Sequence, residues 1–542
     1  MRIILLQFIL LLTFNTNAQI WNWVNHGGSI AGNEIGNGIA IDDSGNTYIT
    51  GVFFQTSTFG NFTLTSSGAQ DIYVAKYDIN GVVQWAKRFG GVSSDNSNKI
   101  AIDQSNNIYI VGSFNDSIKF DNTTLFCSWV DAFVAKLDPM GNAIWAKQGG
   151  GPDYFDSAND VSIDLYKNVI ITGSFGSSSV SFGSYLLNNT SSAIHKNDLF
   201  IVKYDSSGNI AWVQHPSGLG NEGATRISID SHGNIFTLMI FDSTITLANS
   251  TYNTLGSADM MFTKHDSSGT LIWSKHIGGT NYDLPYGISL DSQNNIYLTG
   301  GFSGSVNFGI TTLTSAGIYN ELFLAKYDSL GNELWIRKAG GAGNNVGVSV
   351  ETDSQNNVYV ANSFNGTSIF GSTTLISSGS SDIAISKYSS SGNLVWVAQA
   401  GGTDFDAITD MAVNSKGLIA CTGRFRNTSS FGAYNISSFG NEDAWIAQLT
   451  DQNTVSIDEN LNQRVTIFPN PFSEQTILKT SLFLNNASVI VYNLYGQAVK
   501  QINNITGQEI YLNRYNLSSG IYFIQLLQDK KEVITKKIII AD

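Results

Sequence analysis

The stretch KIAIDQSNNIYIVGSF (99–114), continued by DAFVAKLDPMGNAIWAKQ (131–148), decides the fold of this 542-residue chain. Apolar and polar residues alternate through both stretches, and such a period-2 pattern predicts β-strands. Asp, Asn and Gly stand where the strands meet, at Asp103–Asn107 and Asp138–Asn142. These residues suit tight turns, because the Asp side chain accepts hydrogen bonds from the turn backbone and Gly or Asn takes a positive φ. The two stretches therefore predict one antiparallel four-stranded meander.

The same pattern recurs as seven copies between about residues 20 and 450, with a period of roughly 61 residues. A Trp marks the fourth strand of each copy, at Trp23, Trp85, Trp145, Trp212, Trp273, Trp335 and Trp396. A turn residue follows the first strand, at Asp42, Asp103, Asp164, Asp230, Asp291, Asp353 and Asn414. An acid opens the third strand, at Asp71, Asp131, Asp198, Asp259, Glu321, Asp382 and Asp443. A period of this length indicates a solenoid or a propeller.

The two ends of the repeat region complete each other. The chain begins with a lone Trp strand at 20–26, and the last copy stops near Gln448 without its fourth strand. The first strand can supply the missing one and close a ring without free edges, whereas an open solenoid needs capping repeats. We therefore predict an all-β fold, with a seven-bladed β-propeller over residues 20–450 that is closed by the N-terminal strand.

Composition limits the possible partners. The formal net charge of −14 disfavours nucleic acid and anionic membranes, both of which bind basic stripes. The two cysteines, Cys127 and Cys421, fall in copies that are not neighbours, so we expect free thiols. We expect a monomer.

Residues 1–18 have the pattern of a secretory signal peptide. Arg2 precedes the apolar run 3–14, and the small-residue segment 16–18 suits cleavage. The apolar run is too short to span a bilayer, and we predict no transmembrane segment after its removal.

The repeat gives way to a polar linker at 451–463 and a final domain at 464–542. Short apolar runs separated by turns predict a small Ig-like β-sandwich there.

Four motifs follow one another in this final domain: FPNPF (468–472), VYNLYGQ (491–497), LSSGIYF (517–523) and KKI (536–538). This domain resembles the type A C-terminal sorting domain of the type IX secretion system. The resemblance implies export through that system's translocon, after which the domain is usually removed, and a final location outside the cell or on its surface. The matching residues are Pro469, Asn470, Pro471, Gly496, Gly520, Tyr522, Lys536 and Lys537.

The unit that is repeated over residues 20–450 resembles the SBBP β-propeller repeat of secreted bacterial proteins. The resemblance is carried by D-x-x-G-N-x-Y-x-x-G-x-F and by F-G…L-x-S-x-G-x-x-D. It implies a fold but no particular reaction.

One carboxylate position in the variable loops is a candidate binding site. Eight residues before each turn residue stand Glu34, Asp95, Asp156, Glu222, Asp283, Asn345 and Asp406. By symmetry we expect them around the mouth of a central channel. They could accept N–H groups of the preceding loop, for example at Gly90–Gly91 or Gly401–Gly402, or they could bind a cation such as calcium, which prefers oxygen ligands. Extra aspartates make the third and seventh copies the candidate metal sites: Asp156 and Asp160, and Asp404, Asp406 and Asp410.

The third-strand acids are expected to satisfy loop N–H groups. The lysines five residues on are expected to be solvated: Lys76, Lys136, Lys203, Lys264, Lys326 and Lys387.

No catalytic motif is present in the sequence: we find no G-x-S-x-G, no H-E-x-x-H and no phosphate loop. We therefore predict a secreted, non-catalytic propeller that binds an extracellular or cell-surface ligand, either glycan or protein. A carbohydrate-active enzyme is the alternative, and a passive surface spacer is a third possibility. Charged residues unique to one or two repeats in a deep central pocket would favour the enzyme, and a symmetric, shallow face would favour binding.

Overall fold

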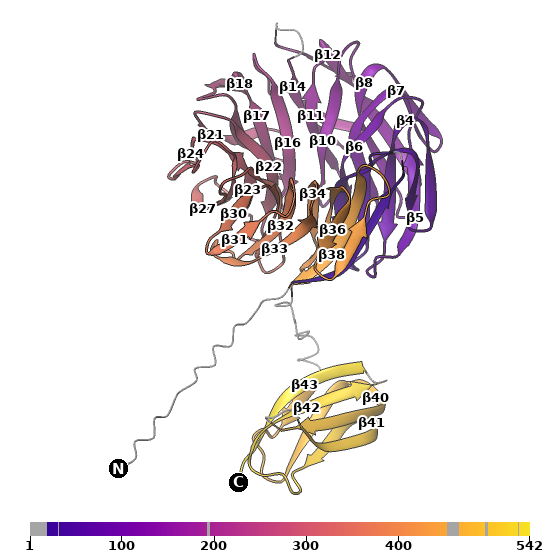
Figure 1. Cartoon of the computed structure of the whole chain (residues 1–542), viewed down its shortest axis with the longest axis vertical. Coiled ribbons are helices and arrows are strands. Elements are labelled where there is room, and N and C mark those ends of the chain that lie inside the picture. Colours follow the sequence, from indigo (N-terminus) through magenta and orange to yellow (C-terminus); the bar gives the residue numbers. More distant parts are fainter. Residues whose placement is uncertain (1–18, 31, 192–195, 452–464, 494–496, 529–530) are drawn as a thin grey trace. The chain divides into compact units, whose positions relative to one another are not determined.

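A computed structural model describes residues 19–30, 32–191, 196–451, 465–493, 497–528 and 531–542 (Figure 1). The chain divides into two compact units, Met1–Asp451 and Gln452–Asp542. The predicted signal peptide (1–18), the predicted linker from residue 452 onward, and Gly496 lie outside the described residues. All regular elements of the described part are β-strands, and no helix there is long and apolar enough to cross a membrane.

Each copy of the repeat, numbered here 1 to 7, contributes a four-stranded antiparallel meander. The inner strands are β2 (Ile35–Ile41), β6 (Asp95–Ile102), β10 (Asp156–Ile163), β16 (Glu222–Ile229), β22 (Asp283–Leu290), β28 (Asn345–Thr352) and β34 (Asp406–Val413). The second strands are β3 (Thr47–Phe59), β7 (Ile108–Phe120), β11 (Val169–Phe175), β17 (Ile235–Phe241), β23 (Ile296–Phe302), β29 (Val358–Phe364) and β35 (Leu418–Phe425). The third strands are β4 (Phe62–Tyr77), β8 (Thr123–Leu137), β14 (Asp198–Tyr204), β20 (Asp259–His265), β26 (Glu321–Tyr327), β32 (Asp382–Tyr388) and β38 (Asp443–Asp451). The fourth strands are β5 (Val83–Phe89), β9 (Ala143–Gly149), β15 (Ile210–Gln214), β21 (Leu271–Gly279), β27 (Glu333–Ala339), β33 (Leu394–Gly402) and β1 (Gln19–Gly28).

A short hairpin extends every repeat between its second and third strands. In repeats 1 and 2 it is continuous with β3–β4 and β7–β8. In the others it is separate, as β12 (Ser179–Phe182) with β13 (Tyr185–Asn188), β18 (Thr244–Leu247) with β19 (Ser250–Asn253), β24 (Ser305–Asn307) with β25 (Thr312–Thr314), β30 (Thr367–Phe370) with β31 (Thr373–Ile376), and β36 (Thr428–Phe431) with β37 (Tyr434–Ser437). The hairpin pairs with the fourth strand of the preceding repeat, as β24 does with β21 and β36 with β33. The sequence did not predict this extension.

The first–second turns are held by their own aspartates, as predicted. Asp42 Oδ1 accepts the N–H groups of Ser44 and Asn46 at 2.9 and 2.8 Å, and Tyr48 donates its hydroxyl to Oδ2 at 3.2 Å. The same cage recurs at Asp103, Asp291 and Asp353. Hydrogen bonds from the turn lower the pKa of Asp103 although burial opposes them. This face of the repeats is thus regular and internally satisfied.

Neighbouring inner strands contact one another from β2 through β34, and β34 in turn contacts β2. Figure 1 shows the meanders arranged around this central set of strands. Strand β1 pairs antiparallel with β38, with His26 opposite Trp445. It also pairs with β3 of repeat 1 through Gly27 and Gly28. The N-terminal strand therefore joins the last repeat to the first.

Each fourth-strand Trp except Trp396 packs on the third–fourth turn of the next repeat. A Cβ added to Gly81 would lie 2.6 Å from the Trp23 ring, so only glycine fits there, and its φ is +80°. Trp23 also donates its indole N–H to the carbonyl of Ile79 at 3.0 Å. Repeat 7 has no such turn, because its fourth strand is β1. There, Lys387 Nζ meets Asp451 Oδ2 at 2.6 Å.

The third-strand lysines correct the expectation of solvated side chains. Lys136, Lys326 and Lys387 are buried, with 5–7% exposure. Lys136 donates to the carbonyl of Ser206 in the next repeat at 3.2 Å and lies over the Tyr109 ring. Ring contact and carbonyl bonding make these side chains part of the junctions between repeats.

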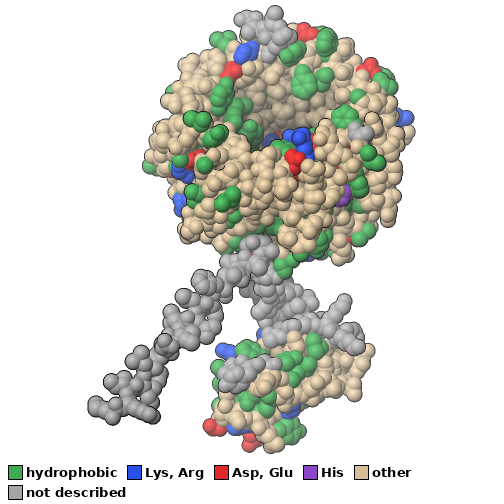
Figure 2. Space-filling view, in the orientation of Figure 1, with side chains coloured by type: hydrophobic (Ala, Val, Ile, Leu, Met, Phe, Trp, Pro, Cys, Tyr) green, Lys and Arg blue, Asp and Glu red, His purple; other side chains and the backbone are tan. Residues whose placement is uncertain are grey.

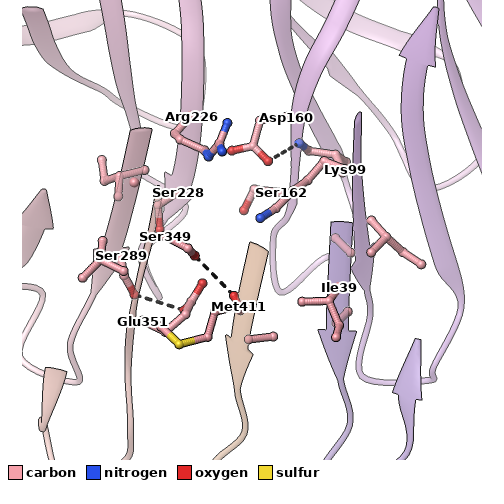
Figure 3. A pocket seen from close by; sticks show the side chains of 18 of the residues that line it. Ile39, Lys99, Asp160, Ser162, Arg226, Ser228, Ser289, Ser349, Glu351 and Met411 are labelled. Atoms are coloured by element: carbon pink, nitrogen blue, oxygen red, sulfur yellow. Dashed lines mark hydrogen bonds between the residues drawn. The ribbon is translucent and has the colours of Figure 1, made fainter. Parts of the chain in front are cut away.

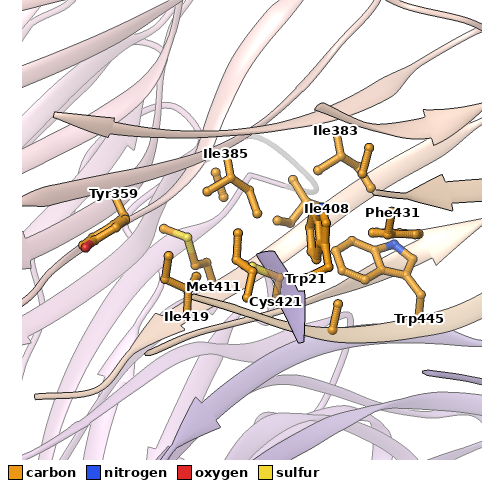
Figure 4. Packing of buried hydrophobic residues seen from close by; sticks show 14 of the residues in the cluster. Trp21, Tyr359, Ile383, Ile385, Ile408, Met411, Ile419, Cys421, Phe431 and Trp445 are labelled. Atoms are coloured by element: carbon orange, nitrogen blue, oxygen red, sulfur yellow. The ribbon is translucent and has the colours of Figure 1, made fainter. Parts of the chain in front are cut away.

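The hydrophobic core lies between successive repeats rather than inside one. Figure 4 shows the cluster between repeats 6 and 7, in which Trp21 of β1 lies beside Phe431 and Trp445. The ring centroids of Trp21 and Phe431 are 5.1 Å apart, and those of Phe431 and Trp445 are 5.0 Å apart. Cys421 is buried in this cluster, and both cysteines are free, as expected.

The second unit is a five-stranded sheet, in the order β39 (Val465–Phe468), β40 (Gln475–Tyr492), β42 (Gly520–Gln528) and β43 (Lys531–Ile540), with β41 (Ala498–Asn513) paired to β40. Its motifs come together. Asn470 accepts the N–H of Ile539 at 2.8 Å and donates to the carbonyl of Lys537 at 3.1 Å. Thr476 donates to the carbonyl of Pro469. Pro471 lies in the same loop. Gly520 pairs with Ile540, Lys536 lies opposite Ile524, and Tyr522 donates to the carbonyl of Ser518. The Ig-like sandwich stays a prediction.

Candidate functional site

A β-bulge interrupts every inner strand. The register shifts between Ser97 and Lys99 in β6 and between Ala158 and Asp160 in β10, and at the equivalent place in the other five. A bulge re-aims the side chain that follows it, and bulges are frequent beside functional sites. The residues that follow the bulge are Gly38, Lys99, Asp160, Arg226, Gly287, Ser349 and Asp410. This position is basic in two repeats, acidic in two and neutral in three, whereas the first–second turns barely change from repeat to repeat.

A cavity of about 270 Å³ lies at the centre of the inner strands. Lys99, Asp160, Arg226 and Ser349 line it, together with a second set of polar residues: Ser162, Ser228, Ser289 and Glu351. Figure 2 looks into a hollow in the repeat unit where basic and acidic side chains gather, and Figure 3 shows the labelled side chains around the open space. We call this space the central channel.

Lys99 and Asp410 form an ion pair across the channel wall. Their Nζ and Oδ1 atoms lie 2.5 Å apart, and Asp410 is 1% exposed. Lys99 belongs to repeat 2 and Asp410 to repeat 7, so the ion pair reaches across repeat 1. Repeat 1 has Gly38 at the equivalent position, and the missing side chain leaves room for the Lys99 side chain. Asp410 Oδ2 also accepts the N–H of Ile39 at 2.9 Å. Asp410 therefore fixes three repeats to one another.

Asp160 also connects neighbouring repeats. Its Oδ2 accepts the N–H of Ile227 in repeat 4 at 2.8 Å, and its Oδ1 accepts the N–H of Val161 at 2.9 Å. Burial raises the pKa of Asp160, while Lys99 and Arg226 oppose that rise. Both carboxylate oxygens are thus engaged by backbone.

Arg226 and Glu351 have more capacity left for a ligand. Among the described residues, Arg226 donates only from Nη1, to the carbonyl of Thr225 at 2.7 Å. Glu351 accepts a hydrogen bond of 3.4 Å from the hydroxyl of Ser289. Burial raises the pKa of Glu351 to about 8, and Lys99 opposes that rise while Asp410 adds to it. The channel therefore presents a guanidinium, a carboxyl group with a raised pKa and several hydroxyls.

The predicted carboxylate ring lies elsewhere than expected. Glu34, Asp95, Asp156, Glu222, Asp283 and Asp406 are 0–2% exposed, and none lines the central channel. We correct the predicted position: each side chain points into the junction between repeats, beneath the loop, and not into the channel mouth. Asp95 and Asp406 accept the N–H groups of Gly91 and Gly402, each at 2.7 Å, which confirms the backbone alternative at these two positions.

Each of these acids lies near the third-strand acid of the preceding repeat. The third-strand acid accepts a loop N–H, as predicted: Asp71 accepts that of Ser67 at 2.9 Å. It also meets a fourth-strand partner, which for Asp71 is Arg88 at 2.7 Å. In the other repeats the partners are Gln148, His215, His276, Lys338, Gln399 and His26.

The candidate metal ligands are not brought together. Among the described residues, no group of three His, Cys, Asp or Glu side chains has a metal-binding arrangement. Asp156 bonds to Ser177, Asp404 to Asn427, and Asp406 to Ser429. Asp160 lines the channel and accepts backbone N–H groups, whereas Asp410 is buried beside it and bonds to Lys99 and to the N–H of Ile39. A calcium site at these residues stays a hypothesis.

Removing the Asp410 carboxylate should destabilise the protein. We expect Asp410→Ala to cost roughly 3 kcal/mol, because Lys99 would lose its counter-ion and the N–H of Ile39 its acceptor. Urea denaturation of the variant measures this cost. Asp410→Asn keeps an oxygen for Ile39 and should cost less, whereas equal effects would mean that the ion pair is not what stabilises this wall.

Two family models match the chain. Residues 466–541 match the secretion system C-terminal sorting domain, and residues 84–116 and 272–300 match the β-propeller repeat named SBBP. The chain thus contains segments that match the SBBP repeat in its first unit and the type IX sorting domain in its second. The sorting domain implies secretion to the cell surface or the extracellular space.

An uncharacterised WD repeat-containing protein of Acanthamoeba polyphaga mimivirus is 22% identical over 472 residues, covering 71% of this chain and 33% of the relative. The chain thus spans about a third of that relative's length. Among solved structures, a polysaccharide lyase, an ulvan lyase, matches at 11% identity with a TM-score of 0.33, covering 84% of this chain and 93% of its own. A Bacteroides vulgatus protein of the DUF4221 family matches at 10% identity with a TM-score of 0.29, covering 80% and 98%. These scores are too low to argue from.

Proposed function

We propose that this chain is an exported binding protein whose central channel receives an extracellular or cell-surface ligand, a glycan or a protein side chain. One observation carries the proposal. The inner-strand position that follows the bulge breaks the seven-fold pattern with Lys99, Asp160, Arg226, Ser349 and Asp410. A residue that served every repeat in the same way would be alike in all of them.

The chemistry of the channel favours a hydroxyl-rich ligand. Arg226 supplies free donors, Glu351 supplies a carboxyl group, and Ser162, Ser228 and Ser289 supply hydroxyls. A few converging polar groups above an apolar wall are typical of small-ligand sites. A sugar unit has the alternating donors and acceptors that such a set would satisfy.

The architecture and export route complete the proposal. We propose that the meanders form one seven-bladed ring in which β1 completes the last blade, and the pairing of β1 with both β38 and β3 supports this. We propose that the sorting domain engages the type IX translocon.

Glycan-array binding by the full chain tests the channel. We expect Arg226→Gln and Glu351→Gln each to weaken binding to any array hit at least tenfold, since each removes a ligand contact worth about 1.4 kcal/mol or more. Lys119→Gln, on an exposed hairpin, is the matched control and should bind normally. Hits that survive both channel substitutions would place the ligand elsewhere on the molecule.

A carbohydrate-active enzyme is the second candidate, and two observations favour it. Lys99, Arg226 and Glu351 are charged residues of the channel that each occur in a single repeat, which is the distribution expected of an enzyme. A carboxyl group with a pKa near 8 beside other carboxylates is the arrangement of a general acid. If polysaccharide is degraded, Glu351→Gln should abolish degradation. Degradation that persists in this variant would remove Glu351 from that role.

A further inference from the structure

Buried carboxylate oxygens without hydrogen-bond partners recur at the junctions between repeats. Among the described side chains they include Oδ1 of Asp71, Asp95, Asp131, Asp259, Asp382 and Asp443, both oxygens of Asp283, and Oε2 of Glu222. All of these residues are 0–4% exposed. Leaving a buried acceptor unsatisfied is costly, and leaving a buried charge unpaired is more so. The repetition of this feature calls for one common explanation.

The unpartnered oxygens belong to acids that lie in pairs. Each pair places the third-strand acid of one repeat near the first-strand acid of the next. The N–H of Asp283 bonds to the carbonyl of the residue before Asp259, at 2.9 Å, and the N–H of Asp406 bonds to the carbonyl of the residue before Asp382, also at 2.9 Å. The pairs are Asp71 with Asp95, Asp131 with Asp156, Asp198 with Glu222, Asp259 with Asp283, Asp382 with Asp406, and Asp443 with Glu34. In five pairs the third-strand acid uses Oδ2 for its loop N–H or its fourth-strand partner and keeps Oδ1 free.

The remaining junction is a natural control. There Asn345 stands in place of the first-strand acid and faces the junction with Glu321. Asn345 donates to Ser368 at 2.5 Å and accepts from Asn362 at 2.8 Å, and Glu321 bonds to Ala316 and Lys338. Neither residue has a buried oxygen without a partner. One neutral side chain is therefore enough to satisfy both members of this pair, although Oδ1 of the neighbouring Asn362 has no partner.

We propose that six junctions between repeats each hold one proton between two buried carboxyl groups, so that acid stabilises the propeller and alkali loosens it. One acid of each pair is neutral and donates its O–H to the other, which stays ionised. The burial of like charges side by side favours this arrangement. The proton does for six junctions what the amide of Asn345 does for the seventh.

The Asp259–Asp283 pair shows the effect most clearly. In repeats 6 and 7, a hairpin serine bonds to the first-strand residue: Ser368 to Asn345 and Ser429 to Asp406. In repeat 5 the equivalent residue is Val306, which has no hydroxyl group. Neither oxygen of Asp283 has a hydrogen-bond partner. The charged or titratable groups that face the pair are His276, whose Nε2 lies 2.6 Å from Asp259 Oδ2, and the two acids themselves. Asp283 is accordingly the member that carries the proton.

Burial and the neighbouring Asp259 raise the pKa of Asp283 to about 8. A group whose pKa is raised in the folded state binds its proton more tightly there than in the unfolded chain. The stability it contributes is therefore complete below its unfolded pKa, near 4, and is lost as the pH rises through about 8. The pKa of Asp95, which burial raises to about 7, acts in the same direction.

Reciprocal substitutions test the proposal by denaturing the full chain in urea between pH 5 and 8.5. In the wild type, the unfolding equilibrium constant should rise with pH, by about tenfold per pH unit for each pair that still shares a proton. Asp283→Asn imitates Asn345 and removes one shared proton. It should therefore reduce the pH dependence of the unfolding equilibrium constant by about tenfold per pH unit, and the stability at pH 8.5 should be preserved or increased. Asn345→Asp creates a seventh pair and should steepen the slope by one proton.

Infrared spectra provide a second readout that does not depend on unfolding. The carbonyl stretch of neutral carboxyl groups should be present at pH 6, should weaken in Asp283→Asn, and should strengthen in Asn345→Asp. A pH-independent stability, or equal effects of both substitutions at pH 5 and 8.5, would overturn the proposal. So would calcium-dependent stabilisation at pH 8.5 that Asp283→Asn abolishes, because a cation would then hold the pair.

Discussion

Deleting residues 20–26 from the full chain should convert the propeller into an aggregating species. The deletion removes the strand that pairs with β38 from Ile20–Thr450 to His26–Trp445, and it leaves the N–H and C=O groups of β38 exposed on that side. An exposed strand edge is a template for pairing with other chains. The deletion also removes Trp21 and Trp23, each 6% exposed, and the loss of a buried Trp costs roughly 3–5 kcal/mol.

Light scattering and thermal denaturation measure this outcome. A synthetic peptide of residues 19–28, added in trans, should bind the deleted protein and restore its monomeric state. The double substitution of Trp21 and Trp23 by Ala is the matched control, because it removes the packing but keeps the backbone pairing. It should melt lower yet aggregate less than the deletion. A deleted protein that stays monomeric with an unchanged melting temperature would show that β1 does not close the ring.

Ending the chain at residue 463 should abolish export. The truncated protein keeps all seven repeats but lacks the sorting domain matched at 466–541. In a host with a type IX system, we expect it to accumulate in the periplasm, where cell fractionation would find it. Fusing residues 464–542 to an unrelated periplasmic protein is the converse control and should carry that protein out. Normal surface display of the truncated chain would contradict the assignment of the sorting signal.

The repeated turns and strands could be predicted because each is specified locally. Asp42 and Asp103 bond to N–H groups two and four residues away, so the sequence of the turn contains the whole interaction. The stretch at 108–114 could be identified as a strand because it is rich in Ile, Val, Tyr and Phe, and it is buried throughout. The fourth-strand Trp also recurs in the sequence, and Trp23 shows its part in the structure, because it bonds to the turn of the next repeat.

The candidate site was harder to predict, because it depends on contacts between distant segments. Lys99 meets Asp410, 311 residues away, and nothing in either local sequence indicates the partner. The bulge that aims both side chains leaves no signature in a single repeat. An available signal was the change from Gly38 to Lys99, Asp160 and Arg226 at one position of aligned repeats. The carboxylates before the inner strands recur in almost every repeat. Their recurrence reflects a position at the junctions between repeats and not at the mouth of the channel.

The junction between repeats 6 and 7 limits where processing can occur. Elsewhere a turn caps the neighbouring Trp and Lys, but here Lys387 pairs with the side chain of Asp451, at the last described residue before the sorting region. A protease that removed the sorting domain after Asp451 would leave this ion pair intact. A cut only a few residues earlier would leave the buried ammonium group of Lys387 without its counter-ion. It would also shorten β38 where β38 pairs with β1. If the sorting domain is removed, the pairing of β1 with β38 and the Lys387–Asp451 ion pair stay intact only when the scissile bond lies beyond Asp451.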